Sequence, residues 1–324
     1  MHRTHALIFL AGMLPASIPS ALGAQYPTHP VRVIVPLAAG GGMDAVTRAL
    51  SQKLGDAMGQ TFVVDNRPGA GNQIGLDIVA SAEPDGYTIM MISATTVIHP
   101  LLYGSRHDVL RDFMPISQAT AQGYGLVIHP SIPAKSVPEF VTYLKARPGQ
   151  VNFASSGIGS PIHMTGELFQ IATGTKMTHV PFKGLGAAYT DLVAGRVQSA
   201  FATVISSLPH VHAGRLRALA VSTPQRVSAM PNVPTLTEAG VPVTVVNWYG
   251  LIGPKRLSPR LQQTLSAEVA KAMHSADMEK RLAGEGSNAV GSSPAEFTAH
   301  LKREQEQWRK VIAEAGIREK LRPH

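Results

Sequence analysis

The sequence predicts an α/β protein with two lobes, each a mostly parallel sheet flanked by helices. Short apolar runs typical of buried strands alternate with helical patterns, and this alternation is typical of parallel sheets covered on both faces. The alternation falls into two groups, which predicts two lobes. With 324 residues, 44% of them hydrophobic and 15% charged, the chain is long enough to bury a core in each lobe.

The first group of elements opens with an apolar run after Pro30. Strands are expected at Val31–Val35, Phe62–Val64 and Tyr87–Ile92. A glycine-rich loop follows the first strand, and Asp44 then has the position of an N-cap for a helix that Gly59 ends. A second helix is expected from about Asn72 to Ala82.

The second group repeats this alternation. Strands are expected at Gly125–Ile128, Val151–Ala154, Thr178–Pro181, Val197–Ala202 and Leu216–Val221. Helix starts are expected at the capping boxes Ser136-x-x-Glu139 and Ser293-x-x-Glu296 and at the pairs Ser160-Pro161 and Ser258-Pro259. After Trp248 the pattern is helical.

The N-terminus has the pattern of a secretory signal peptide. A basic start at Met1–Arg3 precedes the apolar run Ala6–Leu14, and Ala21–Gly23 supplies small residues for cleavage. The run is too short to span a bilayer, which takes about 20 apolar residues. We therefore expect residues 1–23 to be removed on export. A disordered segment or a buried N-terminal strand is the alternative.

Composition excludes several classes of protein. The chain has no cysteine, which rules out a disulfide scaffold and a cysteine nucleophile. Its formal net charge is +8, and a basic surface raises the local concentration of anionic solutes. The basic residues are scattered and are not interleaved with aromatic ones, so we expect no nucleic-acid partner.

The loops that follow the strands are the candidate sites, because ligands of open α/β sheets bind beyond the carboxyl ends of the strands. The first loop contains Ala38, Ala39, Gly40 and Gly41. Its glycines let a ligand approach the backbone, and the next helix start offers N–H groups to an anion. It has neither the Gly-Lys-Ser/Thr of a phosphate loop nor the spacing of a dinucleotide site. A tight turn without a ligand is the alternative.

An equivalent loop lies in the second group. It contains Ser155, Ser156, Gly157, Gly159 and Ser160, and the helix after it starts with a proline. N–H and O–H donors could converge there on a carboxylate, and a plain turn is again the alternative. Two such loops, one in each lobe, indicate that an anion is held from both sides.

Side chains at other strand ends extend the candidate site. Hydroxyls follow two further strands, at Ser93, Thr95, Thr96, Thr203, Ser206 and Ser207. They could bind the polar end of a solute or cap the next helix. His163, just inside the helix after Ser160, could touch the ligand, pack or cap.

Neither catalysis nor a metal site is expected. Ser155 and Ser156 lack the preceding glycine of a G-x-S-x-G elbow, so a serine hydrolase is a remote alternative. The chain has 13 histidines, but the close pair is only His210-x-His212 and H-E-x-x-H does not occur. We expect no cofactor.

Several short motifs follow one another in a specific order and spacing. They are Pro30–Pro36, Ala39–Gly42 with Asp44, Val64–Gly71, Pro84–Thr88, Ser155–Pro161, His179–Gly184, Arg217–Val221 and Pro231–Thr235. In this order they resemble the Bug family, the TctC-like receptor proteins of tripartite tricarboxylate transporters. The similarity extends from about Tyr26 to Gly316.

The resemblance implies a monomeric periplasmic binding protein of the hinge-closing type II, or Venus flytrap, fold. Lobe 1 would comprise residues 24–124 and 225–324, and lobe 2 residues 125–224. The chain would cross near Gly125 and return between Val221 and Tyr249. The family holds the ligand carboxylate with main-chain N–H groups, hydroxyls and waters instead of an arginine clamp. By position, this adds Leu37 to the candidate site.

The resemblance also implies a small carboxylate ligand and a membrane partner. The partner is either the permease of a tripartite transporter or a sensor protein. Many relatives have Phe-Pro where this chain has Leu37-Ala38, and an acid where it has Ala202. Without that acid an amino-acid ammonium group lacks its partner, so we expect a dicarboxylate or an aromatic acid.

Overall fold

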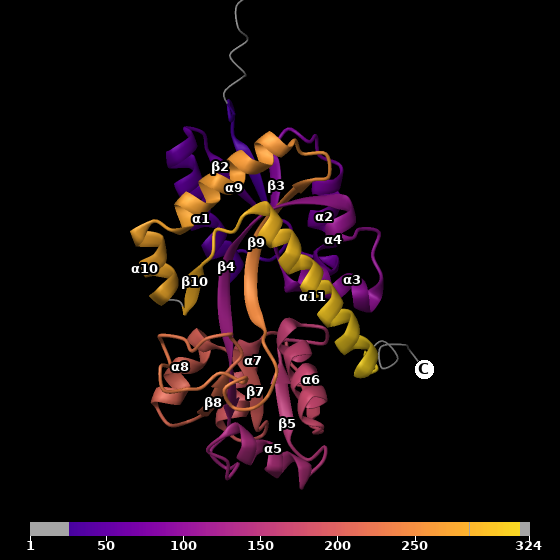
Figure 1. The fold of residues 1–324 in the computed structure, drawn as a ribbon, viewed down its shortest axis with the longest axis vertical. Coiled ribbons are helices and arrows are strands. Elements are labelled where there is room, and N and C mark those ends of the chain that lie inside the picture. The colour runs from indigo at the N-terminus through magenta and orange to yellow at the C-terminus, as the bar shows by residue number, and fades with distance from the viewer. Residues whose placement is uncertain (1–25, 285, 318–324) are drawn as a thin grey trace, which may run out of the picture.

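The structure is a computed structural model that describes residues 26–284 and 286–317. The expected signal peptide, residues 1–23, lies outside the described residues. Figure 1 shows two lobes joined by long strands, with the first elements of the chain in one lobe and the middle of the chain in the other. In the part of the chain that the structure describes, no helix is both long and apolar enough to cross a membrane.

Strands and helices alternate largely as the apolar runs predict. The expectation of a helical pattern directly after Trp248 is wrong, because Val246–Pro254 form a strand and the next helix begins at Pro259. The strands are β1 (Val31–Val35), β2 (Phe62–Asn66), β3 (Thr88–Ser93), β4 (Phe113–Ile128), β5 (Asn152–Ser155), β6 (Thr178–Pro181), β7 (Ser199–Thr203), β8 (Arg217–Val221), β9 (Val246–Pro254) and β10 (Ser287–Ala289). The helices are α1 (Gly42–Met58), α2 (Gln73–Ala80), α3 (Ala94–Tyr103), α4 (Val109–Asp112), α5 (Val137–Lys145), α6 (Pro161–Thr173), α7 (Leu185–Val193), α8 (Val204–His212), α9 (Pro259–Met273), α10 (Ala276–Gly284) and α11 (Pro294–Glu314), with a 3-10 turn at Ala70–Asn72.

Two expected helix starts differ in detail from the structure. α1 begins at Gly42 with Gly41 as its N-cap, so the expectation that Asp44 caps it is wrong. Asp44 lies in the first turn, and its carboxylate accepts the Gly40 N–H instead, at 2.9 Å. At α5, Ser136 caps the helix as expected, whereas the Glu139 carboxylate accepts the N–H of residue 135 and so does not complete the box.

β4 is shared by both sheets and connects the lobes. The sheet of lobe 1 contains β2, β1, β3, β9, β4 and β10, and that of lobe 2 contains β4, β8, β7, β5 and β6. β1 pairs in parallel with β2 and β3, and β5 with β6 and β7. The antiparallel pairs among the described strands all include β4 or β9, because these two carry the chain between the lobes.

The register brings the carboxyl ends of the parallel strands of both lobes to one short stretch of β4. Ser93, at the end of β3, is opposite Tyr249, which is opposite Thr120. Thr203, at the end of β7, is opposite Tyr124. Four residues of strand span about 13 Å. Because β3 and β7 run toward this stretch from opposite directions, the loops that follow them face each other.

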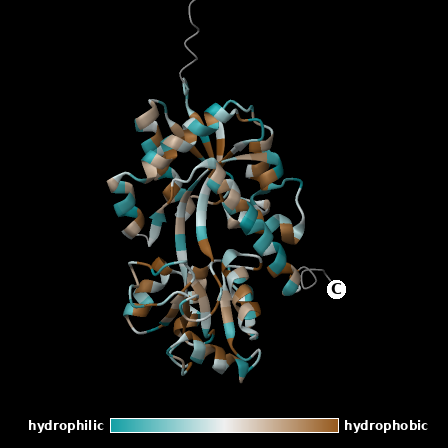
Figure 2. Ribbon diagram, in the orientation of Figure 1, coloured by the Kyte–Doolittle hydropathy of each residue, from teal (hydrophilic) through white to brown (hydrophobic). Residues whose placement is uncertain are grey.

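The hydrophobic core is continuous between the lobes. The largest cluster contains Phe113 and Trp248 of lobe 1 together with Phe153 and Phe169 of lobe 2. α11 joins the two, because it packs against α3 and β4 and also against α6, and its Trp308 is fully buried. In Figure 2, hydrophilic residues recur along α11, in keeping with one buried and one exposed face. Burying each such large side chain contributes about 1.5–3 kcal/mol.

Candidate ligand-binding site

The loop after β1 is exposed at the N-terminus of α1. Leu37 is 41% exposed, and Ala38, Ala39, Gly40 and Gly41 are exposed as well. Gly40 has a φ of +87°, which glycine adopts without strain. Nothing lies within 4 Å of the position that a Cβ would take on Gly40. A ligand therefore has open access to this backbone.

Asp44 and Asn66 hold the same loop from behind. The Asp44 carboxylate accepts hydrogen bonds from Gly40 N at 2.9 Å, Arg48 Nε at 3.0 Å and Asn66 Nδ2 at 3.0 Å. The Arg48 guanidinium, helped by the Gly40 N–H, lowers the pKa of Asp44 to about 2. Asn66 also donates to Leu37 O at 3.0 Å. Asn66 was not among the sequence candidates, although its position at the end of β2 is the signal that could have found it.

The hydroxyls after β3 lie at different depths. Ser93 and Thr96 are buried, whereas Thr95 is partly exposed. Thr96 Oγ1 accepts a hydrogen bond from Asn72 Nδ2 at 3.1 Å, so it supports the loop after β2. Thr95 is therefore the most accessible of the three expected hydroxyls.

The loop after β5 forms around a buried serine. Ser155 is fully buried, and its Oγ lies 2.6 Å from His179 Nε2 and 3.1 Å from both the N and the O of Gly157. Ser160 caps α6 by accepting the His163 N–H at 3.2 Å. In this loop Ser156, Gly157, Ile158 and Ser160 reach the surface, whereas Gly159 is buried.

His163 lies behind this loop, not on its surface. It is 4% exposed, and its Nδ1 accepts the Gly159 N–H at 3.1 Å. His179, its neighbour, belongs to the motif His179–Gly184, which nothing in the sequence connects with Ser155. The two residues are 24 positions apart, so only the pairing of β5 with β6 brings them together.

A chain of hydroxyls follows β7. Thr203 Oγ1 lies 2.7 Å from Ser206 Oγ, which lies 2.8 Å from the hydroxyl of Tyr189. Burial raises the pKa of Tyr189 to about 12, so its hydroxyl remains a neutral donor. Ser207 is fully buried and donates to Val204 O at 2.9 Å, inside its own helix. Tyr189, on α7, had no signal in the sequence.

Helix capping differs between the two ends of the sheets. Side chains cap α4, α5, α9 and α11 through Asp108, Ser136, Ser258 and Ser293. α1, α3, α7 and α8 follow the carboxyl ends of β1, β3, β6 and β7, and their N-caps make no side-chain hydrogen bond. α6, capped by Ser160, is an exception among the helices on the facing side. The uncapped first turns leave N–H groups and the positive ends of helix dipoles for another acceptor.

The lobes touch on both sides of the strands β4 and β9, which cross between them. A Cβ on Gly159 would lie 2.5 Å from Leu102 Cδ1 of α3, so the loop after β5 packs against a helix of lobe 1. A Cβ on Gly286 would lie 3.5 Å from Ile205 of α8, so the turn before β10 packs against a helix of lobe 2. The loop after β5 is thus brought to the helix that carries Thr95.

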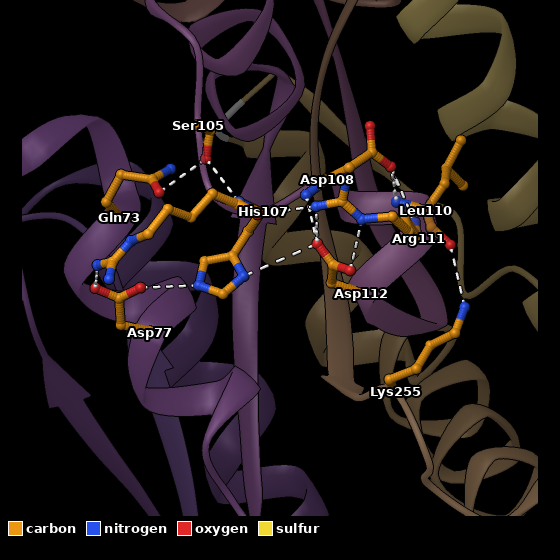
Figure 3. Close-up of polar contacts among 10 residues, drawn as sticks. Gln73, Asp77, Ser105, His107, Asp108, Leu110, Arg111, Asp112 and Lys255 are labelled. Carbon is orange, nitrogen blue, oxygen red and sulfur yellow. Dashed lines mark hydrogen bonds and ion pairs between the residues drawn. The ribbon is translucent and has the colours of Figure 1, made fainter.

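A separate charged network ties the segment between α3 and β4 to α2 (Figure 3). Asp77 accepts from Arg106 at 2.7 Å and contacts His107 Nε2 at 2.8 Å, and Asp112 pairs with Arg111 at 2.7 Å. Its side chains bind one another, so the network serves the packing of lobe 1. Among residues 26–284 and 286–317, no cluster of three or more His, Asp or Glu side chains is arranged to hold a metal ion.

Three surface hollows lie away from the candidate loops. One of about 490 Å³ follows the end of α1 at Gly59 and the amino end of β2. Others of about 480 and 440 Å³ lie between α9 and α11 and beside α5. None of these three adjoins the carboxyl end of a parallel strand, where α/β sheets bind ligands.

The Ser155–His179 contact has the length of a nucleophile–base pair in a serine hydrolase. However, Ser155 is fully buried, and its hydroxyl is also hydrogen-bonded to Gly157. A nucleophile must reach the substrate. The pair is therefore placed to shape the loop.

Comparison with known families decides the class of protein. A sequence model for the tripartite tricarboxylate transporter family receptor matches residues 46–317. The chain belongs to this receptor family. The resemblance seen in the motifs is thereby confirmed, and members of the family are periplasmic solute-binding receptors.

Individual relatives agree with this assignment. The chain is 34% identical to protein BugT of Bordetella pertussis over 316 residues, which cover 96% of each protein. The solved structure of Rpa4515 from R. palustris with adipate has a TM-score of 0.77 and 32% identity, covering 90% of this chain and 98% of that one. MatC from Rhodopseudomonas palustris with bound malate has a TM-score of 0.74 and 28% identity, covering 89% and 100%. The two-lobed α/β fold predicted from the sequence is confirmed.

Proposed function

We propose that this receptor works in the periplasm, closes its lobes on a small carboxylate and delivers it to the permease of a tripartite tricarboxylate-type transporter. The observation that carries the proposal is the capping pattern. Four helices that follow strand ends on the facing sides of the two lobes lack side-chain caps, whereas the N-termini of α4, α5, α9 and α11 have them.

This pattern suits an anion held by the main chain. A helix N-terminus presents several N–H groups and a partial positive charge, which a carboxylate can accept from both lobes at once. The hydroxyl of Thr95 is partly exposed nearby and can donate as well. The hydroxyls of Thr203 and Ser206 donate to Ser206 Oγ and Thr203 O, so they would have to exchange these bonds to donate to a ligand. Closure would remove water from these bonds, and charge-assisted hydrogen bonds are stronger in a dry site.

The lobes of the proposal follow the crossing strands. Lobe 1 comprises residues 24–124 and 225–324, and lobe 2 residues 125–224. The first crossing near Gly125 falls within β4, between its pairing with β9 and its pairing with β7. The return lies between Val221, where β8 ends, and Val246, where β9 begins. Closure would bend the chain at these two points.

The ligand we propose is a carboxylate without an ammonium group, with a dicarboxylate preferred. Ala202 stands where many relatives have an acid, and it is fully buried in β7. Asp44, the acid beside the loop after β1, is buried and already bonded to Arg48. Neither of these two positions therefore offers a free carboxylate to the ammonium group of an amino acid. Two relatives of similar fold were solved with the dicarboxylates adipate and malate.

Thermal unfolding of protein stripped of co-purified ligand tests the proposal. A panel of malate, adipate, benzoate and aspartate is added, and a dicarboxylate at about 100 times its dissociation constant should stabilise the protein by about 2.7 kcal/mol. For a protein of this size, this corresponds to a rise in Tm of several degrees. An unchanged Tm with malate, adipate, benzoate and aspartate, and also with the tricarboxylate citrate, would contradict the proposed function. A rise with aspartate alone would contradict the proposed ligand class.

A further inference from the structure

Two histidines lie stacked directly behind the loop after β5. His163 of α6 and His179 of β6 have ring centroids 3.8 Å apart and an interplanar angle of 21°. Phe153 covers the His179 ring at 4.9 Å between centroids. Phe153 also stacks with His163, at 6.2 Å between centroids, so the three rings pack on one another and the positions of the histidine nitrogen atoms are well defined.

His179 controls the first half of the loop through Ser155. The Ser155 hydroxyl accepts the Gly157 N–H and can donate to Gly157 O, both at 3.1 Å. Its second lone pair is then free for a hydrogen on His179 Nε2, 2.6 Å away. With these bonds the buried hydroxyl is fully satisfied, and Gly157 is tied to the sheet through both of its backbone polar groups.

His163 controls the second half of the loop. Because the Gly159 N–H is a donor, His163 Nδ1 must accept at 3.1 Å, and its hydrogen therefore resides on Nε2. Nε2 lies 3.4 Å from Glu167 Oε1, a partner that favours this tautomer. Each histidine thus presents a different ring nitrogen to the loop.

The loop needs such support because of its glycines. Gly157 and Gly159 have φ angles of +124° and +74°. Glycine samples many conformations when it is not held, and ordering it costs more entropy than ordering any other residue. A loop that is held before the ligand arrives does not incur this cost on binding.

We propose that His163 and His179 are positioning residues that fix the backbone of Gly157 and Gly159 for the ligand carboxylate without touching it. The inference rests on the proposed function for its ligand, but its structural part concerns the protein alone. In this proposal the two histidines increase the affinity for the ligand and are not required for the fold as a whole.

Amide side chains that mimic one ring nitrogen test the proposal. The end of a Gln side chain reaches the position of Nε2, whereas that of Asn reaches the position of Nδ1. His179→Gln can therefore keep the bond to Ser155 and His179→Asn cannot. The order is reversed at the other position, where His163→Asn can keep the bond to Gly159 and His163→Gln cannot.

Two measurements are made on each variant of the mature protein. Amide hydrogen exchange of Gly157 and Gly159 is followed without ligand, and malate and adipate affinities are measured by calorimetry. We expect faster exchange and roughly tenfold weaker binding in His179→Asn than in His179→Gln, and in His163→Gln than in His163→Asn, as the loss of one buried hydrogen bond predicts. His129→Gln is the control, because it breaks a comparable contact to Ser131, 2.8 Å long, away from the loop.

The reversal of the Asn and Gln order between the two positions decides the inference. Equal exchange for Asn and Gln at both positions would overturn it, even if the wild-type protein binds a dicarboxylate. A wild-type protein that binds neither malate nor adipate would contradict the proposed preference for a dicarboxylate instead, while the exchange pattern would still decide whether the histidines hold the loop.

Discussion

Gly159 lies where the lobes touch, in a backbone conformation that side chains avoid. Its φ is +74°, and a Cβ there would lie 2.5 Å from Leu102 Cδ1 across the gap between the lobes. Gly214 has a similar φ of +67°, with nothing within 4 Å of its Cβ position. The two glycines therefore separate the cost of the backbone conformation from the cost of crowding.

We predict that Gly159→Ala destabilises the protein more than Gly214→Ala. Both variants lose about 1 kcal/mol to the left-handed conformation. Gly159→Ala loses up to about 1 kcal/mol more to overpacking, because only the end of the Leu102 side chain has to shift. Urea unfolding measures the difference. Adding Leu102→Ala should recover part of the excess, and equal losses for the two single variants would show that the lobes do not touch at this point.

His300 couples the stability of α11 to pH. Burial lowers the pKa of His300 to about 4, whereas an unfolded histidine titrates near about 6.5. Between these values the unfolded chain binds a proton that the folded protein excludes, so the free energy of unfolding falls as the pH drops from about 6.5 to about 4. Burial raises the pKa of the neighbouring Glu304, which makes its contribution run in the opposite direction.

His300→Phe should flatten this part of the pH profile. The variant removes the titration and keeps an aromatic ring against Trp248, whose centroid is 5.0 Å away. The effect is at most about 3 kcal/mol and smaller because the ring is partly exposed. Urea unfolding at pH 7 and pH 4.5 measures it, with His212→Phe on the exposed end of α8 as control. An unchanged slope in His300→Phe would refute the assignment.

At the scale of elements, helix N-termini divide into those that side chains cap and those that remain open. Ser293 forms a complete capping box with Glu296 at α11, whereas the N-cap Thr203 of α8 makes no side-chain cap bond. The same type of side chain therefore has two different roles. Only the role of Ser293 contributes to the stability of its helix.

Alanine at these two positions should separate stability from binding. Ser293→Ala is expected to lower the free energy of unfolding by about 1 kcal/mol. Thr203→Ala should change it by less than about 0.5 kcal/mol and weaken dicarboxylate binding, because Thr203 is partly exposed at the end of β7, opposite Tyr124 of the crossing strand β4. Chemical unfolding and calorimetry measure the two effects. A loss of stability without a loss of affinity in Thr203→Ala would mean that this hydroxyl acts as a cap.

Most elements could be predicted from the sequence because their signals are local. The apolar runs, the glycine after α1 and the serine caps each depend on neighbouring residues. The first three quarters of β4 and all of β9 could not be predicted. A strand that crosses between the lobes is buried on both faces, so its apolar and polar residues need not alternate. Ser117 and Gln118 of β4 are buried polar residues bonded to Ser292, which no local pattern reveals.

The candidate site shows the same limit. The loops Ala38–Gly41 and Ser155–Ser160 could be nominated from their glycines and hydroxyls, and Leu37 only from the family resemblance. The residues that hold them could not, because Asn66 reaches back 22 positions to Asp44 and His179 reaches back 24 to Ser155. Contacts of this length depend on strand pairing, which the sequence does not show.

At the scale of the whole molecule, one buried serine joins both crossings. Ser222 Oγ accepts the Tyr124 N–H of β4 at 3.0 Å and donates to Val245 O, just before β9, at 2.5 Å. The backbone of Ser222 bonds to the same two residues. The outgoing and returning chain are thus held at one point, so we expect the lobes to rotate about it as rigid units.

The distance between the lobes in solution, with and without ligand, tests the central claim most directly. The chain has no cysteine, so the double variant Gln52→Cys and Thr190→Cys can be labelled at these two positions alone. It carries one spin label on an exposed position of α1 and a second on an exposed position of α7. We predict that saturating malate or adipate shortens and narrows the distance distribution. Full binding with an unchanged distribution would contradict the account.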